Sequence, residues 1–335
     1  MSAFIFEIAV FSLKALIIVL LILFLVVGLI VIISRGKSFH PHKITIKNLN
    51  EKYNEIKETL LHEIQSKKLF KKYIKEQKKA EKQQEKQVGQ EKHVFVLHFH
   101  GDIKASAVTA LREEVSAIVS VATPQDEVLV CIESGGGTVN GYGLAAAQLM
   151  RIRERNIPLT VSIDKIAASG GYMMACIANK IIAAPYAIVG SIGVIVQLPN
   201  FHRYLKDRHI DFEQHMAGDF KRTITIFGEN TDAERKKLDK ELEEIHALFK
   251  KLIVDHRPHI DIKKVATGEH WLAIQALDLQ LVDKLQTSDD YMLAKSQTAK
   301  LFEIKFETKK PFGNRFFAGA QAWRDKFMSL FKFGL

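Results

Sequence analysis

From residue 93 onward, short apolar runs alternate with amphipathic stretches. The apolar runs predict strands at residues 94–99, 127–132, 159–163 and 180–184. Apolar side chains that recur every three or four positions predict helices at residues 105–121, 139–155 and 231–256. Strands separated by helices of this length are typical of βαβ units, so we expect an α/β fold built on a largely parallel sheet.

Two later segments extend this pattern. Residues 181–198 are strongly apolar, but Pro185, Gly190 and Gly193 interrupt them, which favours core strands with a turn over a membrane span. A further strand is expected at residues 210–215. One face of the long helix carries apolar side chains that suit a core or a subunit contact, namely Leu238, Leu242, Ile245, Leu248, Phe249 and Leu252.

The N-terminal segment differs in kind from the rest of the chain. Residues 15–33 form an uncharged apolar stretch of 19 residues, about the length that a helix needs to cross roughly 30 Å of hydrocarbon. A cleaved signal peptide would have a shorter apolar region and a small-x-small cleavage site. We therefore expect a membrane anchor over residues 1–35, with a single transmembrane helix.

A basic segment follows the anchor at residues 36–92. Between positions 35 and 92 the chain carries 16 Lys or Arg against 8 Glu, so most of its net charge of +10 lies here. Its spacing predicts an exposed helical stalk. A basic helix that touches anionic lipid is the main alternative, whereas nucleic-acid binding is disfavoured because no recognition motif accompanies the charge.

The C-terminal tail, residues 311–335, mixes aromatic and basic side chains. This composition predicts a basic amphipathic segment, which could lie on a membrane surface, contact a neighbouring subunit or pack on its own domain. The remaining part, residues 93–310, is nearly neutral and forms the expected enzymatic domain.

Composition excludes several kinds of chemistry. The chain has no Walker loop, no His-Glu-x-x-His motif and no paired cysteines, so we expect neither a metal nor another cofactor. The two cysteines, Cys131 and Cys176, lie in apolar surroundings and are interpreted as small buried side chains.

The candidate chemistry lies in two glycine-rich turns, each of which follows an apolar run. Ser169 stands in the sequence Ala-Ala-Ser-Gly-Gly-Tyr, where a buried strand turns into a helix, and residues 133–137 read Glu-Ser-Gly-Gly-Gly. Ligand sites of parallel sheets lie beyond the carboxyl ends of the strands. Glycines allow close backbone approach, and free N–H groups hold anions. Together these turns suggest an acyl-transfer site.

A serine nucleophile needs a base, and two residue types could supply it. The chain has 13 histidines, but those that we weighed stand singly, without a distinguishing context. Lys221, in a loop between the expected strand at 210–215 and the long helix, is the better candidate. A lysine acts as a base only where burial strips water from its amine.

These motifs occur in an order that resembles a known family. The turns at 133–139 and 167–172, Gly-Ser-Ile-Gly-Val at 190–194 and Ala-Gly-Asp-Phe-Lys-Arg-Thr at 217–223 are similar to those of the bacterial signal peptide peptidases, in particular the membrane-anchored SohB type. Further similarity lies at 266–271 and 281–283. The resemblance covers residues 93–306 and includes the N-terminal span.

The resemblance implies a ClpP/crotonase-like fold with a repeated ββα core, and a serine-lysine dyad. Ser169 would be the nucleophile and Lys221 the base, and the backbone N–H groups of Gly136 and Gly170 would form the oxyanion hole. It also implies a homo-oligomeric ring. Ser191 could orient Lys221 through its hydroxyl, a suggestion that rests only on its polar surroundings. A simple turn serine is the alternative.

One departure from the family concerns Gly135, where proline is common. Three consecutive glycines lose more entropy on ordering, so the oxyanion donor could be held less firmly. The predicted function is a membrane-anchored serine endopeptidase that cleaves peptides or membrane-protein segments. The alternatives are a catalytically weak or silent peptide-binding scaffold and acyl-CoA chemistry on the same fold.

The expected location is the bacterial inner membrane, with lipid as a partner. The basic residues that follow the apolar stretch favour a cytoplasmic domain, whereas the family favours a periplasmic one.

Overall fold

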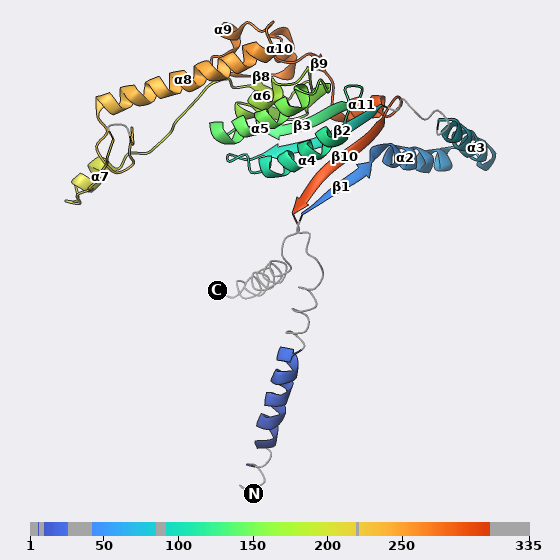
Figure 1. Ribbon diagram of the computed structural model, residues 1–335, viewed down its shortest axis with the longest axis horizontal. Helices are drawn as coiled ribbons and strands as arrows, with labels where there is room; N and C mark the ends of the chain where they lie inside the picture. The colour runs from blue at the N-terminus through green and yellow to red at the C-terminus, as the bar shows by residue number, and fades with distance from the viewer. Residues whose placement is uncertain (1–5, 7–9, 26–41, 85–91, 219–220, 309–335) are drawn as a thin grey trace, which may run out of the picture. The chain divides into compact units, whose positions relative to one another are not determined.

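The computed structural model describes residues 6, 10–25, 42–84, 92–218 and 221–308 (Figure 1). Residues 44–306 form one compact unit, which contains the sheet and the candidate site. Residues 1–43 and 307–335 form the second unit, most of which lies outside the described residues.

Parallel strands make up most of the central sheet. The strands follow one another in the order β1-β10-β2-β3-β4-β6-β9, and the neighbours from β10 to β9 are parallel. Their bounds are β1 His42–Asn48, β2 His93–Gly101, β3 Glu127–Ser134, β4 Leu159–Ile163, β6 Lys180–Ala183, β9 Lys284–Leu285 and β10 Lys300–Thr308.

A short branch leaves this sheet at the carboxyl end of β3. There β5 (Ile166–Ala168) pairs with β3, β7 (Ile188–Gly190) pairs with β5 in parallel, and β8 (His270–Leu272) pairs with β7 in the antiparallel direction. The branch carries the chain past the end of the main sheet, where the glycine-rich turns lie.

Helices cover both faces of the sheet. On one face α4 (Val108–Val121), α5 (Val139–Arg153) and α6 (Gly170–Ala175) share a hydrophobic core with the strands. On the other face α2 (Leu49–Ile64) and α11 (Ser288–Lys295) contribute Leu49, Tyr291 and Met292 to a second core. The remaining helices are α3 Lys67–Gln84, α7 His202–Lys206, α8 Asp232–His256, α9 Ile262–Val265 and α10 Ala273–Asp278.

The alternation of side chains along β2 explains why both faces need a cover. Phe95, Leu97 and Phe99 point into the first core, whereas Val94 and Val96 point into the second. Successive residues of a strand face opposite sides of the sheet, so a strand that is apolar throughout is buried on both. The predicted strands at 94–99, 127–132, 159–163 and 180–184, and the parallel sheet, are therefore confirmed.

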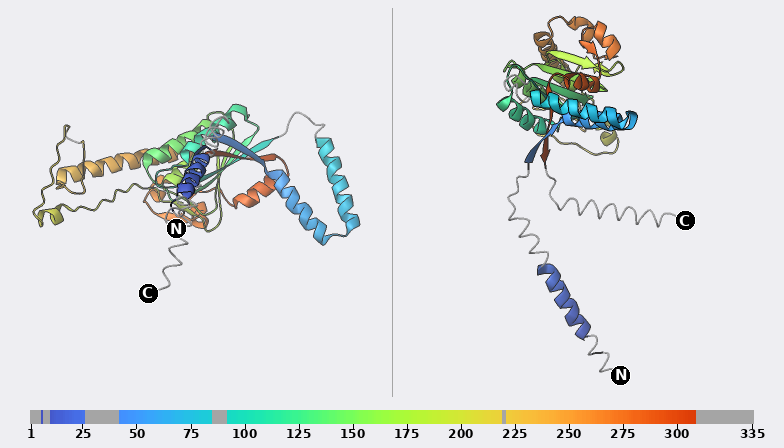
Figure 2. Two further views of the ribbon diagram at one scale, coloured as in Figure 1. Left: turned by 90° about the horizontal axis from the view of Figure 1, so that it is seen from below. Right: turned by 90° about the vertical axis from the view of Figure 1, so that its right-hand side faces the viewer.

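The predicted strand at 210–215 is wrong, because these residues form an extended loop with no sheet partner. They belong to the segment of residues 194–230, which we call the arm. The arm leaves the sheet after β7, carries α7 and leads into α8 (Figures 1 and 2). Ile210 and Phe212 alternate with charged side chains as in a strand, but both are exposed, since no strand edge lies beside them.

The predicted membrane span is not confirmed. Residues 10–25 are helical and their side chains are mostly exposed, but positions 26–33 of the predicted span lie outside the described residues. Among the residues that the structure describes, no helix combines the length and the apolar character needed to cross a membrane. The predicted tail at 311–335 also lies outside them, and the predicted domain boundaries stay predictions.

An ion pair between buried Arg257 and partly exposed Asp283 attaches the C-terminal end of α8 to the sheet. Both terminal nitrogens of Arg257 donate to the carboxylate of Asp283, over 2.8 and 2.7 Å, and the N–H of Ile181 donates to the same carboxylate over 2.6 Å. Burial would raise the pKa of Asp283, but these hydrogen bonds outweigh it and the pKa is lowered. The charged pair therefore stabilises the fold at neutral pH.

We predict that Asp283→Asn lowers the free energy of unfolding by about 2–4 kcal/mol at pH 7, because it leaves the guanidinium of Arg257 without its counter-charge. Since the pKa of Asp283 is lowered on folding, its contribution is lost as the pH falls below about 4, and the two proteins should then converge. Denaturant titrations at pH 7 and pH 3 measure both effects.

The matched control is Asp261→Asn, which removes an exposed pair with Lys264 and should change stability by less than about 0.5 kcal/mol. Equal effects of the two substitutions would contradict a structural role for the pair of Arg257 and Asp283.

Candidate active site

The register of the sheet brings three turns to one place. Gly101 pairs with Ser134, Ser134 pairs with Ala167, and Ala168 pairs with Gly190. These residues are the carboxyl ends of β2, β3, β5 and β7 or lie next to them. The glycine-rich turn, Ser169 and Ser191 follow directly, so the turns after β3, β5 and β7 lie side by side. The sequence predicts this for the first two turns.

Ser169 occupies a sharp turn between β5 and α6. Its φ of 51° and ψ of −117° are sterically unfavourable for a residue with a side chain. The backbone is held on both sides, because the Ser169 N–H donates to Gly190 O over 2.8 Å and the Ser169 carbonyl accepts from the N–H of Met173 over 2.9 Å. A strained strand-to-helix turn of this kind presents a nucleophile away from the backbone, and the residue is half-buried.

The glycines after Ser169 let α6 pack without space for a side chain. A Cβ on Gly170 would lie 2.3 Å from Cγ of Tyr142, and one on Gly171 would lie 2.6 Å from the carbonyl oxygen of Ser134. Both distances are impossible for real atoms, so the glycines are required where α6 contacts α5 and β3. The predicted close approach of another backbone is confirmed at Gly171, whereas at Gly170 the close neighbour is the side chain of Tyr142.

Gly136 lies against Ser169 from the other side. With a φ of 91°, its missing Cβ would be 2.7 Å from Cβ of Ser169 and 2.8 Å from the nitrogen of Gly170. Three of the predicted site residues, Gly136, Ser169 and Gly170, are thus in direct contact. Two backbone amides beside a hydroxyl are the arrangement that stabilises an oxyanion during acyl transfer.

The two amides differ in their hydrogen bonding. Among the described residues, no hydrogen-bond partner is found for the N–H of Gly170, as expected at the start of a helix. The N–H of Gly136 instead donates to the hydroxyl of Ser134 over 3.1 Å. The first amide is available to a ligand, and the second is shared with the protein.

Beneath the glycine-rich turn lies a pair of hydroxyl groups that the sequence analysis did not identify. Ser134 and Tyr142 are buried and hydrogen-bonded to each other, and the Tyr142 hydroxyl donates to the carbonyl of Asp102 over 2.8 Å. Burial raises the pKa of Tyr142, so its proton is retained. Gly101 makes room for the pair, since its Cβ would lie 2.3 Å from the tyrosine oxygen.

Ser191 lies at the same edge, after β7. Its N–H donates to the carbonyl of Glu269 over 2.7 Å, and its φ is 52°. Like Ser169 it has a constrained backbone and is half-buried. This placement suits either a residue that orients the base or a serine of a turn.

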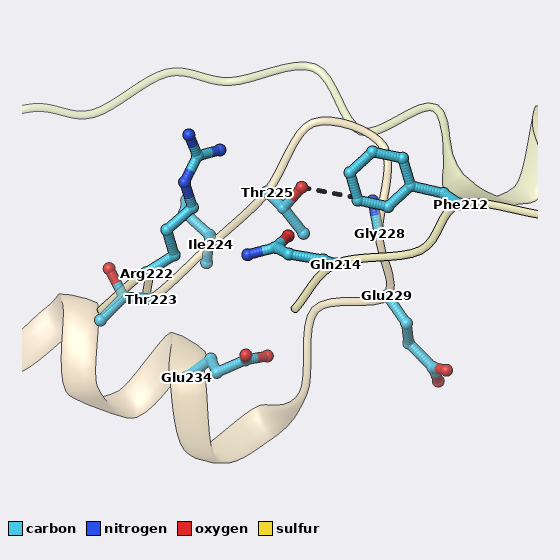
Figure 3. A pocket seen from close by; sticks show the side chains of 9 residues that line it. All are labelled: Phe212, Gln214, Arg222, Thr223, Ile224, Thr225, Gly228, Glu229 and Glu234. Atoms are coloured by element: carbon cyan, nitrogen blue, oxygen red, sulfur yellow. Dashed lines mark hydrogen bonds between the residues drawn. The ribbon is translucent and has the colours of Figure 1, made fainter. Parts of the chain in front are cut away.

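Lys221 lies elsewhere, on the arm, and is exposed. Its neighbour Arg222 lines a cavity of about 210 Å³ together with Glu234, at the N-terminal end of α8 (Figure 3). By contrast, the buried residues of α8 in the core that contains α6 are Phe249 and Ile253, and Leu252 is half-buried against the same core. The 15 residues from Glu234 to Phe249 span about 22 Å of helix.

A single chain therefore does not bring Lys221 to Ser169. The N-terminal part of α8 starts with a capping box between Thr231 and Glu234, so local hydrogen bonds define this end of the helix although it does not pack on the core. Leu248, predicted on the packed face, is largely exposed. The predicted core face of α8 is confirmed at Phe249, which is buried, and at Leu252, which is half-buried against the same core.

The arm exposes many large apolar side chains. They lie on both sides of α7, and those with more than two-fifths of their surface exposed are Ile195, Val196, Leu198, Phe201, Tyr204, Ile210, Phe212, Met216 and Phe227. An apolar surface of this extent on a water-facing segment marks an interaction surface.

Within the part of the chain that the structure describes, the cysteine thiols and the side chains that could bind a metal ion do not offer an alternative active site. Burial raises the pKa of Cys131 and of Cys176 to about 12, so neither thiol supplies a thiolate. In the described ranges no group of three or more His, Cys, Asp or Glu side chains is placed to hold a metal ion.

Comparisons with known proteins match nearly the whole chain. The model of the peptidase family S49 N-terminal domain matches residues 3–149, and that of peptidase family S49 matches residues 151–302. The chain is 48% identical to the probable protease SohB of Haemophilus influenzae, over 93% of this chain and 91% of the relative. It is 45% identical to the probable protease SohB of Buchnera aphidicola subsp. Schlechtendalia chinensis, over 87% and 99%.

A more distant relative is a putative protease of Methanocaldococcus jannaschii, which is 29% identical over 57% of this chain and 64% of the relative.

We predict that Gly170→Ala destabilises the fold by about 1–3 kcal/mol, because the added methyl group must displace the ring of Tyr142. Gly143→Ala, in α5, is the matched control. Nothing lies within 4 Å of its new Cβ, so the substitution should stabilise the helix by about 0.5–1 kcal/mol. Denaturant titrations that rank the two variants the other way would contradict the packing.

Proposed function

The chain belongs to peptidase family S49, and on this basis we propose that it is a serine endopeptidase with Ser169 as its nucleophile. Membership confirms the family resemblance, and both the family and the relatives support a peptidase. The observation that carries the serine mechanism is the contact of Gly136, Ser169 and Gly170 at the carboxyl edge of the sheet. The scaffold and the acyl-CoA hypotheses are not favoured, since the matched relatives are named as proteases.

In the proposed reaction the uncharged amine of Lys221 takes the proton of Ser169, and the serine oxygen attacks the carbonyl carbon of the peptide bond. The N–H groups of Gly136 and Gly170 stabilise the oxyanion that forms. The C–N bond then breaks, and the lysine gives the proton to the leaving amine. Water, deprotonated by the same lysine, hydrolyses the resulting ester and restores Ser169.

In this proposal the base comes from a neighbouring copy of the chain. Lys221 is exposed, and its neighbour Arg222 lies beside Glu234 at the N-terminal end of α8. Roughly 20 Å of helix separates Glu234 from Phe249 in the core that holds α6, whereas a base has to be in hydrogen-bond reach of its proton. A lysine also needs a desolvated pocket to lose its charge. Insertion of one copy's arm beside Ser169 of the next copy would meet both requirements.

The exposed apolar side chains of the arm support this assembly. A heterologous contact, in which the arm of each copy packs on a different surface of the next, closes into a ring if the rotation between copies allows it. We therefore propose a homo-oligomeric ring. Ser191, at the same edge as Ser169, is proposed to orient the incoming lysine.

The apolar stretch at residues 15–33 supports attachment to a bacterial inner membrane, with peptides or membrane-protein segments as substrates. The flanking charges favour a cytoplasmic domain and the family a periplasmic one. Protease digestion of the domain in sealed vesicles of known orientation decides between the two sides.

We predict that the purified protein in detergent degrades casein, and that Ser169→Ala and Lys221→Ala each lower the rate by a factor of about 10³ or more, because each removes half of the dyad. Arg222→Ala, which removes the adjacent positive charge, is the control and should retain most activity. Equal rates in wild type, Ser169→Ala and Lys221→Ala would exclude the dyad.

Coexpression of the two inactive variants with different tags tests the source of the base. If neighbouring copies supply it, mixed assemblies should recover about a quarter of the wild-type rate, since one pairing in four joins an intact serine to an intact lysine. A mixed assembly as inactive as its parents would show that each chain completes its own site.

A further inference from the structure

The hydroxyl pair of Ser134 and Tyr142 touches both backbone donors of the proposed oxyanion hole. The Ser134 hydroxyl accepts from the N–H of Gly136 over 3.1 Å. The ring of Tyr142 lies so close to Gly170 that a Cβ there would be 2.3 Å from Cγ and 2.6 Å from Cδ2. Each member of the pair thus fixes one donor, and the hydrogen bond between them links the two.

The protons of this pair have one consistent order. Tyr142 has a single hydroxyl proton, which it donates to the carbonyl of Asp102 over 2.8 Å. Ser134 must then donate to the tyrosine oxygen, and its lone pairs remain for the N–H of Gly136. The result is a directed chain of hydrogen bonds from Gly136 through Ser134 and Tyr142 to Asp102, in which each bond strengthens the next.

Burial and steric fit hold this chain in place. Ser134 is 2% exposed and Tyr142 is 0% exposed. Gly101 leaves room for both, because it has no side chain. The three consecutive glycines have no side chains that could pack. The hydrogen bond from the Gly136 N–H to the Ser134 hydroxyl therefore ties the Gly135–Gly137 turn to a buried side chain.

We propose that Ser134 and Tyr142 are positioning residues that hold the Gly136 and Gly170 amides at a fixed spacing for the oxyanion. They supply the rigidity that proline at position 135 would otherwise give the turn. This inference rests on the proposed function of the site.

One opposing effect has to be weighed. The N–H of Gly136 has one proton, so an oxyanion must share it with Ser134 in a three-centre bond. Loss of the hydrogen bond between the Gly136 N–H and the neutral Ser134 hydroxyl would favour oxyanion binding by roughly fivefold. Fixing one free backbone residue costs about five- to thirtyfold, so holding Gly136 alone costs at least as much as the competition. Ordering therefore outweighs competition, and removal of the Ser134 hydroxyl should slow the reaction.

The test compares hydroxyl deletions in the full-length protein in detergent. With fluorescent casein as substrate, Ser134→Ala should lower kcat about ten- to hundredfold, which is less than the loss of a whole donor. Tyr142→Phe keeps the ring against Gly170 and should lower kcat about three- to tenfold. KM should stay within about twofold, because the oxyanion forms only in the transition state.

The matched control is Tyr291→Phe, which removes another buried tyrosine hydroxyl, one that binds Glu127 far from the site. It should change stability without changing kcat. A peptide aldehyde provides a second readout, since its adduct with Ser169 places an oxygen between the two amides. Its affinity should fall in parallel with kcat in Ser134→Ala and remain unchanged in Tyr291→Phe.

Hydrogen exchange of the peptide that covers residues 134–138 tests the inference without activity. Ser134→Ala and Tyr142→Phe should speed exchange in this segment, and Tyr291→Phe should not. The positioning role would be overturned if Ser134→Ala kept both the hydrogen-exchange rate and the kcat of the wild type, or if it raised kcat. If Ser169→Ala is as active as the wild type, the proposed function fails instead, and exchange alone then decides whether the pair orders the turn.

Discussion

The candidate site depends on the parallel register that aligns the carboxyl ends of β3, β5 and β7. A displacement of one residue in any of these pairings would turn Ser134, Ala168 or Gly190 to the opposite face of the sheet. The hydrogen bond from the Ser169 N–H to Gly190 depends on that register, and it holds the strained backbone of the serine. The burial of β3 and β4 on both faces stabilises this register. The geometry of the candidate site therefore depends on the packing of the core.

The sequence was sufficient to predict the parts of the molecule that are governed by local pattern. Apolar runs located the strands, and the glycines beside Ser169 indicated a close backbone approach, which the carbonyl of Ser134 makes at Gly171. The strand predicted at 210–215 failed because alternation shows only that a segment can pair, not that a strand edge lies within reach. The hydroxyl pair of Ser134 and Tyr142 was missed for a related reason, since it joins residues from two elements whose packing no local pattern records.

The described residues of the arm and the N-terminal part of α8 do not pack on the core of their own chain. The capping box at Thr231 starts a long helix whose outer part has no core to pack on, and the loop before it leaves apolar side chains in water. Sequence motifs placed Lys221 in a loop before the long helix but carried no information on how far that loop lies from Ser169. Folding of the sheet and completion of the dyad are thus separate events in the proposed mechanism.

That separation has a consequence for how such an enzyme is controlled in the cell. In the proposed mechanism, a newly synthesised copy would hold a nucleophile with no base and would be harmless to the proteins around it. Activity would then rise more steeply than the amount of protein made, because several copies must meet before any is competent. Because the length of α8 keeps Lys221 away from Ser169 of the same chain, proteolysis would begin only above the concentration at which copies assemble.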